Sequence, residues 1–520
     1  MNEPVTPNSG IPGDSLTAQP EIPTPDVVYT QPAQAPMQPT DVPDQPFVVP
    51  AATASNVNPF IPQVTPEANS GYTQTTVAAH SGGGLRRVFM LIVILLAVAG
   101  AIFFGSKYFT GNPLQGNNTA ALTYWGLWED DSTIRSVLAD FEATHPGVTV
   151  TYSKQNPKQY RERLQAFIEK GEGPDVFRFH NTWVPMLRNE LYPAPATIMT
   201  ASEFSTAFYP VASADLVGGE SVYGIPMMID GLGLYYNEDL FAAAGVAPPV
   251  TWEDVLNIVP KLTVKRDNTI ITSAIALGTT GNVQHFSDIF ATMMMQNGAK
   301  PSNPSGQQAE EAITFYKKFA TPSDPVYTWN ETMDDSIFAF ASGKVAMILA
   351  PSWRVFDIKQ ISPSLRFKVL PIPQLPGNTV TWASYWVEGV SSKSKNPGAA
   401  WELVKYMTSS EVTVKFYTEV SKTRLFGEPY ARVDLGSTIS EDPYAGAFIK
   451  QASTAKSFPL SSRTFDNGLN DKLIKYIEDA INSMSQGTSA QGALETAAQG
   501  FRQVLGSYGL TTGSASTTAQ

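Results

Sequence analysis

An uninterrupted apolar run from Val88 to Gly105 divides the chain and limits what it can form. Its 18 residues include no charged or strongly polar side chain. As a helix the run would be about 27 Å long, close to the roughly 30 Å hydrocarbon core of a bilayer. A buried core helix and a cleaved signal peptide are the alternatives. A signal peptide is shorter in its apolar part and lies at the N-terminus, so we predict an uncleaved signal anchor, a transmembrane helix over residues 86–106.

The charges that flank this run predict its orientation. Arg86 and Arg87 precede it and Lys107 follows it. The positive-inside rule then places the N-terminal tail in the cytoplasm and the roughly 415 residues after the run outside the cell. We therefore predict a single-pass protein of the cell membrane with an extracellular C-terminal part. Residues 107–120 are polar, and we expect them to form a short tether.

Residues 1–85 have a composition unlike that of the rest. They contain no Lys or Arg, seven acidic residues and 15 of the 40 prolines. Such a segment buries too little apolar surface to offset its chain entropy, so we predict a disordered, acidic, Pro-rich cytoplasmic tail. This tail carries −7 of the net charge of −12, which leaves 35 basic and 40 acidic residues after it. That near balance, without a basic stripe, argues against nucleic-acid binding.

Helix and strand patterns alternate after the tether. Apolar residues recur at helical spacing from Ile134 to Phe141, at Ile134, Val137, Leu138 and Phe141, and again at Tyr160, Leu164, Phe167 and Ile168. Residues 148–154 alternate as a strand, and residues 174–179 read as another. This order is typical of an α/β fold with a mostly parallel sheet and helices on its faces.

The same pattern continues downstream. Asn237 is a suitable N-cap for the next helix, Gly245 a suitable end for it, and residues 251–254 resemble a capping box with Asp254 in its last position. Residues 344–349, "KVAMIL", are apolar enough for a strand that is covered on both faces. Because some 385 residues of such pattern exceed one typical domain, we predict two lobes.

The sequence contains no recognisable catalytic or metal-binding motif. It has no cysteine, and its four histidines lack the spacing of a zinc site. Neither a GxSxG nucleophile elbow nor a complete glycine-rich nucleotide motif is present. The two carboxylates of a glycosidase need only meet in space, so a carbohydrate-active enzyme stays open as an alternative. We expect no enzyme activity, no metal and no cofactor.

Aromatic residues follow several predicted strands, next to polar side chains. Trp125 and Trp128 precede Glu129, and Trp353 lies beside Arg354. Ligands of open α/β sheets bind beyond the carboxyl ends of the strands. Indole and phenol rings there offer flat apolar faces that suit the C–H face of a sugar, while carboxylates and amides bind its hydroxyls. Ordinary core packing is the alternative for each ring.

Six segments, in a fixed order, carry a family resemblance. They are "FEATHPGVTVTY" at 141–152, "GEGPDVF" at 171–177, "YGIP…YYN" at 223–237, "PPVTWED" at 248–254, "FASGKVAMI…W" at 340–353 and "SSKSKNPGAAWELVKYMTSSE" at 391–411. Together they resemble the extracellular solute-binding proteins of ABC importers, the large group that includes the maltose-binding protein. The resemblance covers residues 121–505.

The resemblance implies a type II periplasmic-binding-protein-like fold, whose two α/β lobes are joined by crossing strands and close on a sugar or oligosaccharide. It implies lobe 1 over about 121–231 and 379–430, lobe 2 over about 232–378 and 431–505, and a flexible tail at 506–520. It also implies a monomeric binding domain that delivers its solute to the permease subunits of an ABC transporter. A transmembrane solute sensor with the same binding fold is the alternative function.

The chain departs from the family in two places. Members are released after signal cleavage or tethered through a lipidated cysteine, whereas this chain has no cysteine and carries the apolar run. Residues 381–392, "TWASYWVEGVSS", are bulkier and more charged than the glycine pair that the family often has there. The second departure predicts an unusual floor of the solute site.

The resemblance also implies the residues that bind solute. Trp125 and Glu129 follow the first predicted strand, and Asp175, Asn181 and Thr182 are assigned to the region after the third. Asp230 follows the "YGIP" strand, and Gly231 and Gly233 are predicted hinge positions. Trp353, Trp382, Tyr385 and Arg424 match further regions that line the solute site. Three of these have alternatives, since Asp175 or Asp230 could cap a turn and Arg424 could pair with a surface acid.

Overall fold

The computed structural model describes residues 119–510. The predicted disordered tail, the predicted transmembrane helix at 86–106, and nearly all of the predicted tether lie outside the described residues. Within 119–510, no helix is long and apolar enough to cross a bilayer. The anchor and the tail therefore stay predictions.

The first sheet is built on three parallel strands that two helices connect. Its elements are β1 (Ala120–Gly126), α2 (Asp131–Thr144), β2 (Val148–Lys154), α3 (Tyr160–Lys170) and β3 (Val176–His180). β1 lies in the middle, with Tyr124 opposite Tyr152 of β2 and opposite Val176 of β3. All four apolar positions predicted for α2 are buried, which confirms that helix and its inner face.

One apolar position of α3 does not follow the prediction. Tyr160, Leu164 and Ile168 are buried, but Phe167 is 39% exposed. Its ring lies 5.5 Å from the ring of Trp125, edge to face, at the rim of the sheet. The helical spacing alone cannot tell a rim position from a core position, because both lie on the same apolar stripe.

Three further strands complete the first sheet. They are β4 (Leu191–Tyr192), β7 (Ile225–Pro226) and β14 (Trp386–Ser391). Of these, only β14 runs against β1, β2 and β3. The strand order is β2-β1-β3-β14-β4, with β7 also paired to β14. β14 runs antiparallel to β3, so that Trp386 lies opposite His180. β14 is the exception to the predicted mostly parallel sheet, since it enters without the helical crossover that a parallel strand needs.

The second sheet has five strands in the order β12-β8-β11-β10-β9. They are β8 (Gly233–Asn237), β9 (Val264–Arg266), β10 (Thr269–Ile275), β11 (Val345–Ala350) and β12 (Phe367–Leu370). β10 and β11 are parallel, whereas the other neighbours are antiparallel. Every residue of β11 is buried, as its apolar sequence predicts for a central strand.

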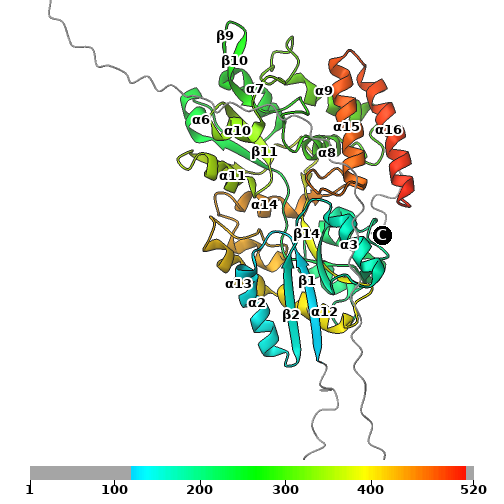
Figure 1. Ribbon diagram of the computed structural model, residues 1–520. Helices are drawn as coiled ribbons and strands as arrows, with labels where there is room; N and C mark the ends of the chain where they lie inside the picture. The colour runs from blue at the N-terminus through cyan, green and yellow to red at the C-terminus, as the bar shows by residue number, and fades with distance from the viewer. Residues whose placement is uncertain (1–118, 511–520) are drawn as a thin grey trace, which may run out of the picture. The chain divides into compact units, whose positions relative to one another are not determined.

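Helices pack on both sheets. Around the first sheet lie α4 (Ala201–Ala207), α5 (Pro210–Leu216), α12 (Pro397–Met407), α13 (Ser410–Ser421) and the 3-10 turns η1 (Asn181–Trp183) and η2 (Val433–Thr438). Around the second lie α6 (Glu238–Ala244), α7 (Trp252–Leu262), α8 (Phe286–Gln296), α9 (Gln307–Lys318), α10 (Ser336–Ala341), α11 (Arg354–Ile361) and α14 (Gly446–Gln451). The chain then forms the turn η3 (Ala452–Thr454) and the helices α15 (Leu469–Ser485) and α16 (Ala490–Ser507), which lie side by side (Figure 1).

Local capping fixes where α6 and α7 begin. The Asn237 side chain accepts hydrogen bonds from the N–H groups of Asp239 and Leu240, at 2.9 and 3.0 Å. Thr251 and Asp254 form the predicted capping box, with each side chain bonded to the backbone N–H of the other residue. Both predictions are confirmed, because side-chain caps depend on a few neighbouring residues only.

Three chain segments connect the two sheets. The first, 227–232, leaves β7 of the first sheet and enters β8 of the second. The second, 371–385, leads back from β12 to β14 and contains the short strand β13 (Thr381–Trp382), and the third contains β15 (Ala455–Lys456), which pairs with β13. The predicted lobe boundaries themselves stay a prediction.

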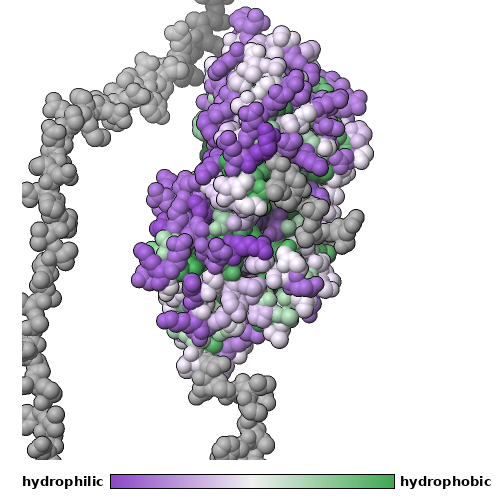
Figure 2. All heavy atoms as spheres, turned by 90° about the vertical axis from the view of Figure 1, so that its right-hand side faces the viewer, coloured by the Kyte–Doolittle hydropathy of each residue, from purple (hydrophilic) through white to green (hydrophobic). Residues whose placement is uncertain are grey.

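One face of the described residues is mainly polar. Figure 2 shows one face of the described residues, on which hydrophilic side chains predominate and hydrophobic ones form smaller patches. Such a surface fits the predicted exposure of these residues to water outside the cell.

Gly231 and Gly233 are places of close backbone approach. Gly231 forms an isolated bridge with Ala383, and a Cβ atom at position 231 would lie 1.9 Å from the carbonyl oxygen of Trp382. A Cβ atom at position 233 would lie 2.6 Å from a methyl carbon of Val369. Close packing alone therefore requires both glycines, and their role as hinges stays a prediction.

This packing predicts a large effect of Gly231→Ala. The added methyl group has to displace backbone of the second crossing segment, so we expect a loss of about 2 kcal/mol or more in the free energy of unfolding. Urea titration checks it, with Gly398→Ala as the control, because a Cβ there meets no atom within 4 Å. Equal unfolding midpoints for wild type and Gly231→Ala would contradict the close approach.

Candidate functional site

Four rings gather at the carboxyl end of β1 and β3. Trp386 lies at their centre, with ring-centroid distances of 5.4 Å to Trp128, 5.4 Å to Trp183 and 5.1 Å to His180. Trp128 follows β1 and is 38% exposed, whereas Trp183 is fully buried. The cluster thus presents the indole of Trp128 to solvent, supported by the partly buried ring of Trp386 and the buried ring of Trp183.

His180 is fixed within this cluster by hydrogen bonds at both ring nitrogens. Its Nδ1 lies 2.8 Å from the hydroxyl of Thr182, and its Nε2 lies 3.0 Å from the hydroxyl of Ser384. Burial lowers the pKa of His180 to about 3, so the imidazole is neutral near pH 7. A neutral imidazole donates through one nitrogen and accepts through the other, so both hydroxyls are held.

A buried ion cluster lies under the same edge. Arg178 of β3 bonds Glu129, with nitrogen–oxygen distances of 2.7 and 2.6 Å, and Glu388 of β14, at 2.7 Å. All three side chains are almost inaccessible to water. The pKa of Glu388 is raised by burial, although Arg178 opposes this shift, and its second oxygen has no hydrogen-bond partner. The cluster has two carboxylates for one guanidinium.

A second partly exposed indole lies at the carboxyl end of β11. Trp353 packs edge to face against His285 with 5.7 Å between ring centroids, and the guanidinium of Arg354 lies 4.1 Å from the Trp353 ring. The Nε of Arg354 donates to His285 at 3.1 Å. Trp353 is therefore held between two ordered neighbours at the edge of the second sheet.

Asp230 joins the first crossing segment to the end of β11. Its carboxylate accepts hydrogen bonds from the N–H of Gly231 at 2.8 Å and from the N–H and hydroxyl of Ser352 at 3.0 and 2.9 Å. Its carbonyl oxygen accepts from the N–H of Ser384. Burial raises the pKa of Asp230 to about 7, while the hydrogen bonds act in the opposite direction.

Asp215 of α5 connects the other crossing segments. Its carboxylate accepts hydrogen bonds from Asn181 at 2.8 Å and from the Tyr385 hydroxyl at 2.7 Å, and a further one from Ser457. Asn181 in turn accepts from the backbone N–H of Tyr385. Burial raises the pKa of Asp215 as well.

Asp288 of α8 has the same role on the second lobe. It accepts from the indole N–H of Trp382 at 2.9 Å and from the backbone N–H of Ser462 at 3.0 Å. Burial raises the pKa of Asp288 to about 6. Each of these three aspartates therefore ties at least one crossing segment to a lobe.

Comparison with known proteins identifies the family. Residues 136–429 match the family described as bacterial extracellular solute-binding protein. The chain belongs to this family.

Among the residues that the structure describes, no group of three or more histidines, aspartates and glutamates is placed to hold a metal ion.

Similar sequences are bacterial binding proteins. The multiple sugar-binding protein of Streptococcus mutans is 24% identical over 315 residues, which is 56% of this chain and 71% of that protein. The maltodextrin-binding protein MdxE of Bacillus subtilis is 27% identical over 257 residues, which is 46% of this chain and 57% of that protein.

Solved structures share the two-lobed α/β fold. The sugar-binding protein MalE from Xanthomonas citri gives a TM-score of 0.62 at 19% identity, over 75% of this chain and 98% of that one. A cyclo/maltodextrin-binding protein complexed with maltotetraose gives 0.60 at 20% identity, over 74% and 97%. These likenesses confirm the predicted periplasmic-binding-protein-like fold.

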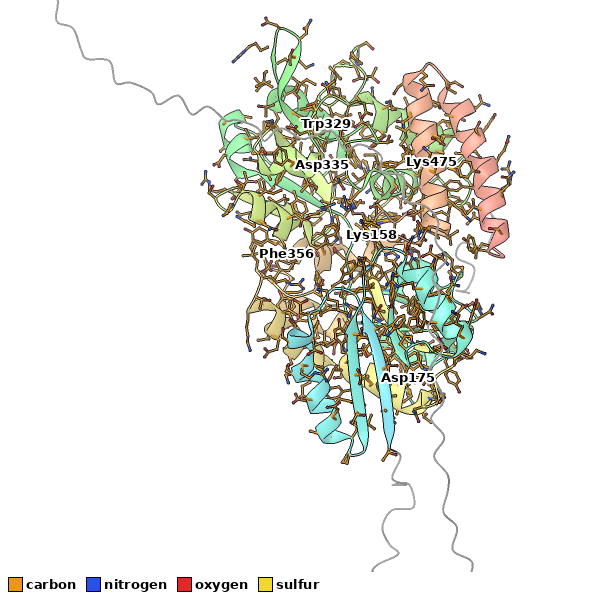
Figure 3. All side chains as sticks on the ribbon, viewed as in Figure 1. Lys158, Asp175, Trp329, Asp335, Phe356 and Lys475 are labelled. Carbon is orange, nitrogen blue, oxygen red and sulfur yellow. The ribbon has the colours of Figure 1, made fainter. Side chains whose placement is uncertain are left out.

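Asp175 was predicted to follow the third strand, and this prediction is wrong. β3 begins at Val176, so Asp175 precedes it, and its carboxylate accepts from the N–H and hydroxyl of Thr123 and from Ser394. In Figure 3, Lys158 lies beyond the carboxyl end of β2, whereas Asp175 lies back along the strands. Asp175 thus stabilises the start of β3, as the turn-capping alternative describes.

Most of the other predicted binding residues bond to protein atoms. Glu129, Asn181, Thr182, Trp382 and Tyr385 are buried. Thr182 accepts from Asn470 at the start of α15, and the other four have the partners given above. Their contact with solute stays a prediction.

Trp125 and Arg424 lie in different surroundings. Trp125 lies within β1, so the prediction that it follows the first strand is wrong, and its ring packs against Phe167 of α3. Arg424 pairs with Glu428 and lies over the Phe356 ring, which agrees with its alternative role in a surface ion pair. Among the ten predicted residues, Trp353 has the position that best fits a binding edge, because its indole is partly exposed, whereas the carboxylate of Asp230 is buried and bonded to Gly231 and Ser352.

Sequence reasoning missed several residues that form this edge. Asp215, His285 and Asp288 are far from any quoted motif, and no local pattern marks them as partners of the crossing segments. Trp386 carried a usable signal, since it stands in the aromatic group that follows Trp382.

The raised pKa of Asp230 predicts a pH-dependent stability. Because the folded protein holds this proton up to about pH 7 and the unfolded chain releases it near pH 4, raising the pH between these values lowers the free energy of unfolding. Asp230→Asn removes this contribution, and Ser352 can rotate its hydroxyl to accept from the amide. The variant should gain stability relative to wild type by up to about 1.4 kcal/mol per pH unit across that window.

Urea titrations of both proteins at pH 5, 6, 7 and 8 measure this difference. Asp267→Asn, in the exposed turn between β9 and β10, is the matched control and should run parallel to wild type. A difference between Asp230→Asn and wild type that is constant with pH would show that Asp230 does not titrate in this range.

Proposed function

We propose that this chain is a membrane-anchored extracellular binding protein that captures a sugar or oligosaccharide and delivers it to the permease of an ABC transporter. The observation that carries the sugar assignment is the exposed indole of Trp128 on the aromatic base of Trp386 and Trp183. A second partly exposed indole, Trp353, lies at the corresponding edge of the second sheet. The names of the sequence relatives support the same class of solute.

The chemistry of these edges suits a neutral polyhydroxylated solute. Indole faces stack on the C–H face of a pyranose ring, and this contact needs no charge. Hydrogen-bonding groups lie next to the rings, namely the hydroxyl of Ser384 beside His180 and the guanidinium of Arg354 beside Trp353. A mainly apolar surface with a few placed polar groups is typical of small-molecule sites.

Closure of the two lobes would enclose the solute. The crossing segments are the connection about which the lobes can turn, and Asp215, Asp230 and Asp288 hold these segments in place. A solute drives such closure only through contacts that are better in the closed state than in the open one. Aromatic surfaces on both lobes provide contacts of this kind, because a pyranose ring has two faces.

The buried acids favour binding over hydrolysis. A glycosidase needs two carboxyl groups on either side of a glycosidic bond. Glu129 and Glu388 are both held by Arg178 below the surface, and Asp230 is held by Ser352. Committed to protein donors, these carboxylates are poorly placed to reach a bound glycan.

The apolar run at 88–105 supports the membrane anchor in this proposal. A binding protein must stay near its permease, and this chain has no cysteine through which a lipid could hold it. A transmembrane helix replaces that lipid anchor. The N-terminal tail would then lie in the cytoplasm and residues 119–510 outside the cell.

The proposal predicts that Trp128→Ala weakens sugar binding. Loss of one stacking face should lower the affinity of the best-bound glycan about tenfold or more. Isothermal titration of the full-length chain against malto-, xylo- and galacto-oligosaccharides measures it. Trp125→Ala is the matched control. It removes a nearby indole that packs on Phe167, so it should change the affinity about twofold at most.

Two results would overturn the sugar assignment. One is binding of an unrelated solute with no response to any of the three glycan series. The other is equal affinity in wild type and Trp128→Ala, provided that the melting temperatures of both variants show them to be folded.

A further inference from the structure

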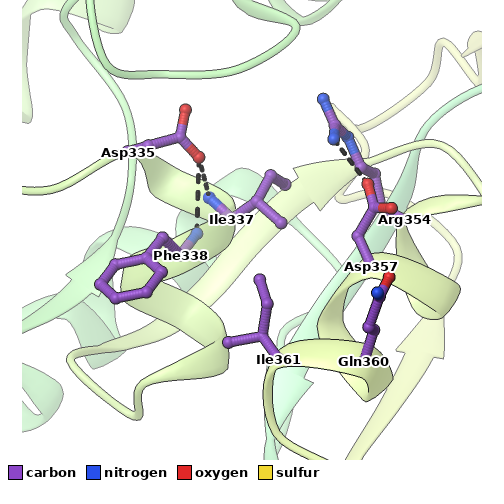
Figure 4. A pocket seen from close by; sticks show the side chains of 7 residues that line it. All are labelled: Asp335, Ile337, Phe338, Arg354, Asp357, Gln360 and Ile361. Atoms are coloured by element: carbon purple, nitrogen blue, oxygen red, sulfur yellow. Dashed lines mark hydrogen bonds and ion pairs between the residues drawn. The ribbon is translucent and has the colours of Figure 1, made fainter.

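A separate pocket lies between α10 and α11, on the second lobe. It has a volume of about 250 Å³. Asp335 and Phe338 line it from the side of α10, and Arg354, Asp357, Gln360 and Ile361 line it from the side of α11. Figure 4 shows the two groups of side chains facing each other across the open space. None of the ten residues that the sequence predicts to bind solute lines this pocket.

The pocket has one apolar side. Phe338 is 47% exposed and Ile361 is 46% exposed, although both are large apolar residues. Exposed apolar side chains are common singly, but here two of them border one cavity together with polar groups. The Phe338 ring therefore offers a free face to a ligand.

The polar groups of the pocket are only partly used by the protein. Asp357 accepts from Arg354 through its Oδ2 atom at 2.7 Å, and within residues 119–510 no protein group donates to its Oδ1 atom. Asp335 is used at both oxygens, because Oδ1 accepts from the N–H groups of Ile337 and Phe338 and Oδ2 accepts from the amide of Gln284. The exposed amide of Gln360 can donate and accept. These groups match the hydroxyls of a sugar.

Charge argues against an anionic ligand. Two carboxylates face one guanidinium, so the charge of the lining is negative. The guanidinium of Arg354 already donates to Asp357, to His285 at 3.1 Å and to Gln284 at 2.9 Å. A phosphate or carboxylate would meet uncompensated negative charge there, whereas a neutral saccharide would not.

Arg354 connects this pocket to the proposed binding edge. One part of its guanidinium lines the pocket, and the same group lies 4.1 Å from the ring of Trp353. Arg354 is 7% exposed and held by three side chains, so it forms a fixed wall common to both places. Trp353 and the pocket therefore have Arg354 as a common neighbour.

We infer that the pocket between α10 and α11 is a subsite for one further residue of an oligosaccharide, which stacks on Phe338 and bonds to Asp357 and Gln360. This inference rests on the proposed function, and it makes the solute an oligosaccharide instead of a single sugar. Binding would then strengthen with each added sugar residue until the pocket is filled.

The test compares wild type and Phe338→Ala in full-length form by isothermal titration. The probes are glucose, maltose, maltotriose and maltotetraose, with the xylo- and galacto-oligosaccharides of the same lengths. In the series that binds, wild-type affinity should rise with length. Phe338→Ala should lower the affinity of the longest member about tenfold and leave the shortest binding member within about twofold.

Phe338→Tyr keeps the ring and should keep wild-type affinity for every length. Phe167→Ala, which removes another partly exposed phenylalanine on α3, should also bind as wild type does. Melting temperatures establish that each variant is folded.

The outcomes separate the two proposals. If no glycan binds wild type, the proposed function fails and the subsite fails with it. If glycans bind with equal affinity to wild type and Phe338→Ala at all lengths, the sugar assignment stands and the subsite is overturned. An equal loss of affinity at every length would also overturn the subsite. If the pocket binds only an added sugar residue, removing Phe338 cannot weaken the binding of the shortest glycan.

Discussion

Three buried carboxylates, those of Asp215, Asp230 and Asp288, hold the segments that cross between the two sheets. Each accepts hydrogen bonds from a crossing segment or from the strand end beside it. Burial raises the pKa of all three, so their ionised forms depend on those donors. The crossing region is therefore organised by directional polar bonds, which fix how the segments meet more strictly than apolar contacts do.

The proposed binding edges share this organisation. Ser384, between Tyr385 and the β13 strand, bonds His180 below the aromatic cluster, while Ser352, next to Trp353, bonds Asp230. A change at either aromatic surface can thus reach the crossing segments through a single side chain. This short connection gives solute contacts a physical route to the arrangement of the lobes.

The sequence predicted the local parts of this structure well. The Asn237 cap, the Thr251 capping box and the inner face of α2 depend on neighbouring residues, and all are confirmed. Asp175 was misplaced because one residue decides whether a side chain precedes or follows a strand. The antiparallel entry of β14 was missed because pairing between distant strands leaves no local pattern.

The binding edge was predicted only in part, for the same reason. Trp353, at the proposed binding edge, was predicted because a motif surrounds it. Trp128 and Trp125 are three residues apart in one motif, and only the fold shows that Trp128 joins Trp386 while Trp125 packs on α3. Asp215 and Asp288 have partners 170 and 94 residues away, which single-sequence patterns do not reveal.

Solute-driven movement of the two lobes is the central claim, and a distance between them tests it most directly. We place spin labels at Ala143→Cys on α2 and Thr314→Cys on α9, both exposed helix positions. The chain has no cysteine of its own, so the labels attach at these two positions alone. Pulsed electron paramagnetic resonance on the full-length protein, in a detergent without a sugar headgroup, measures the distance. The account predicts a shift to a shorter distance when a binding oligosaccharide saturates the site. An unchanged distance distribution, with binding established by calorimetry, would contradict it.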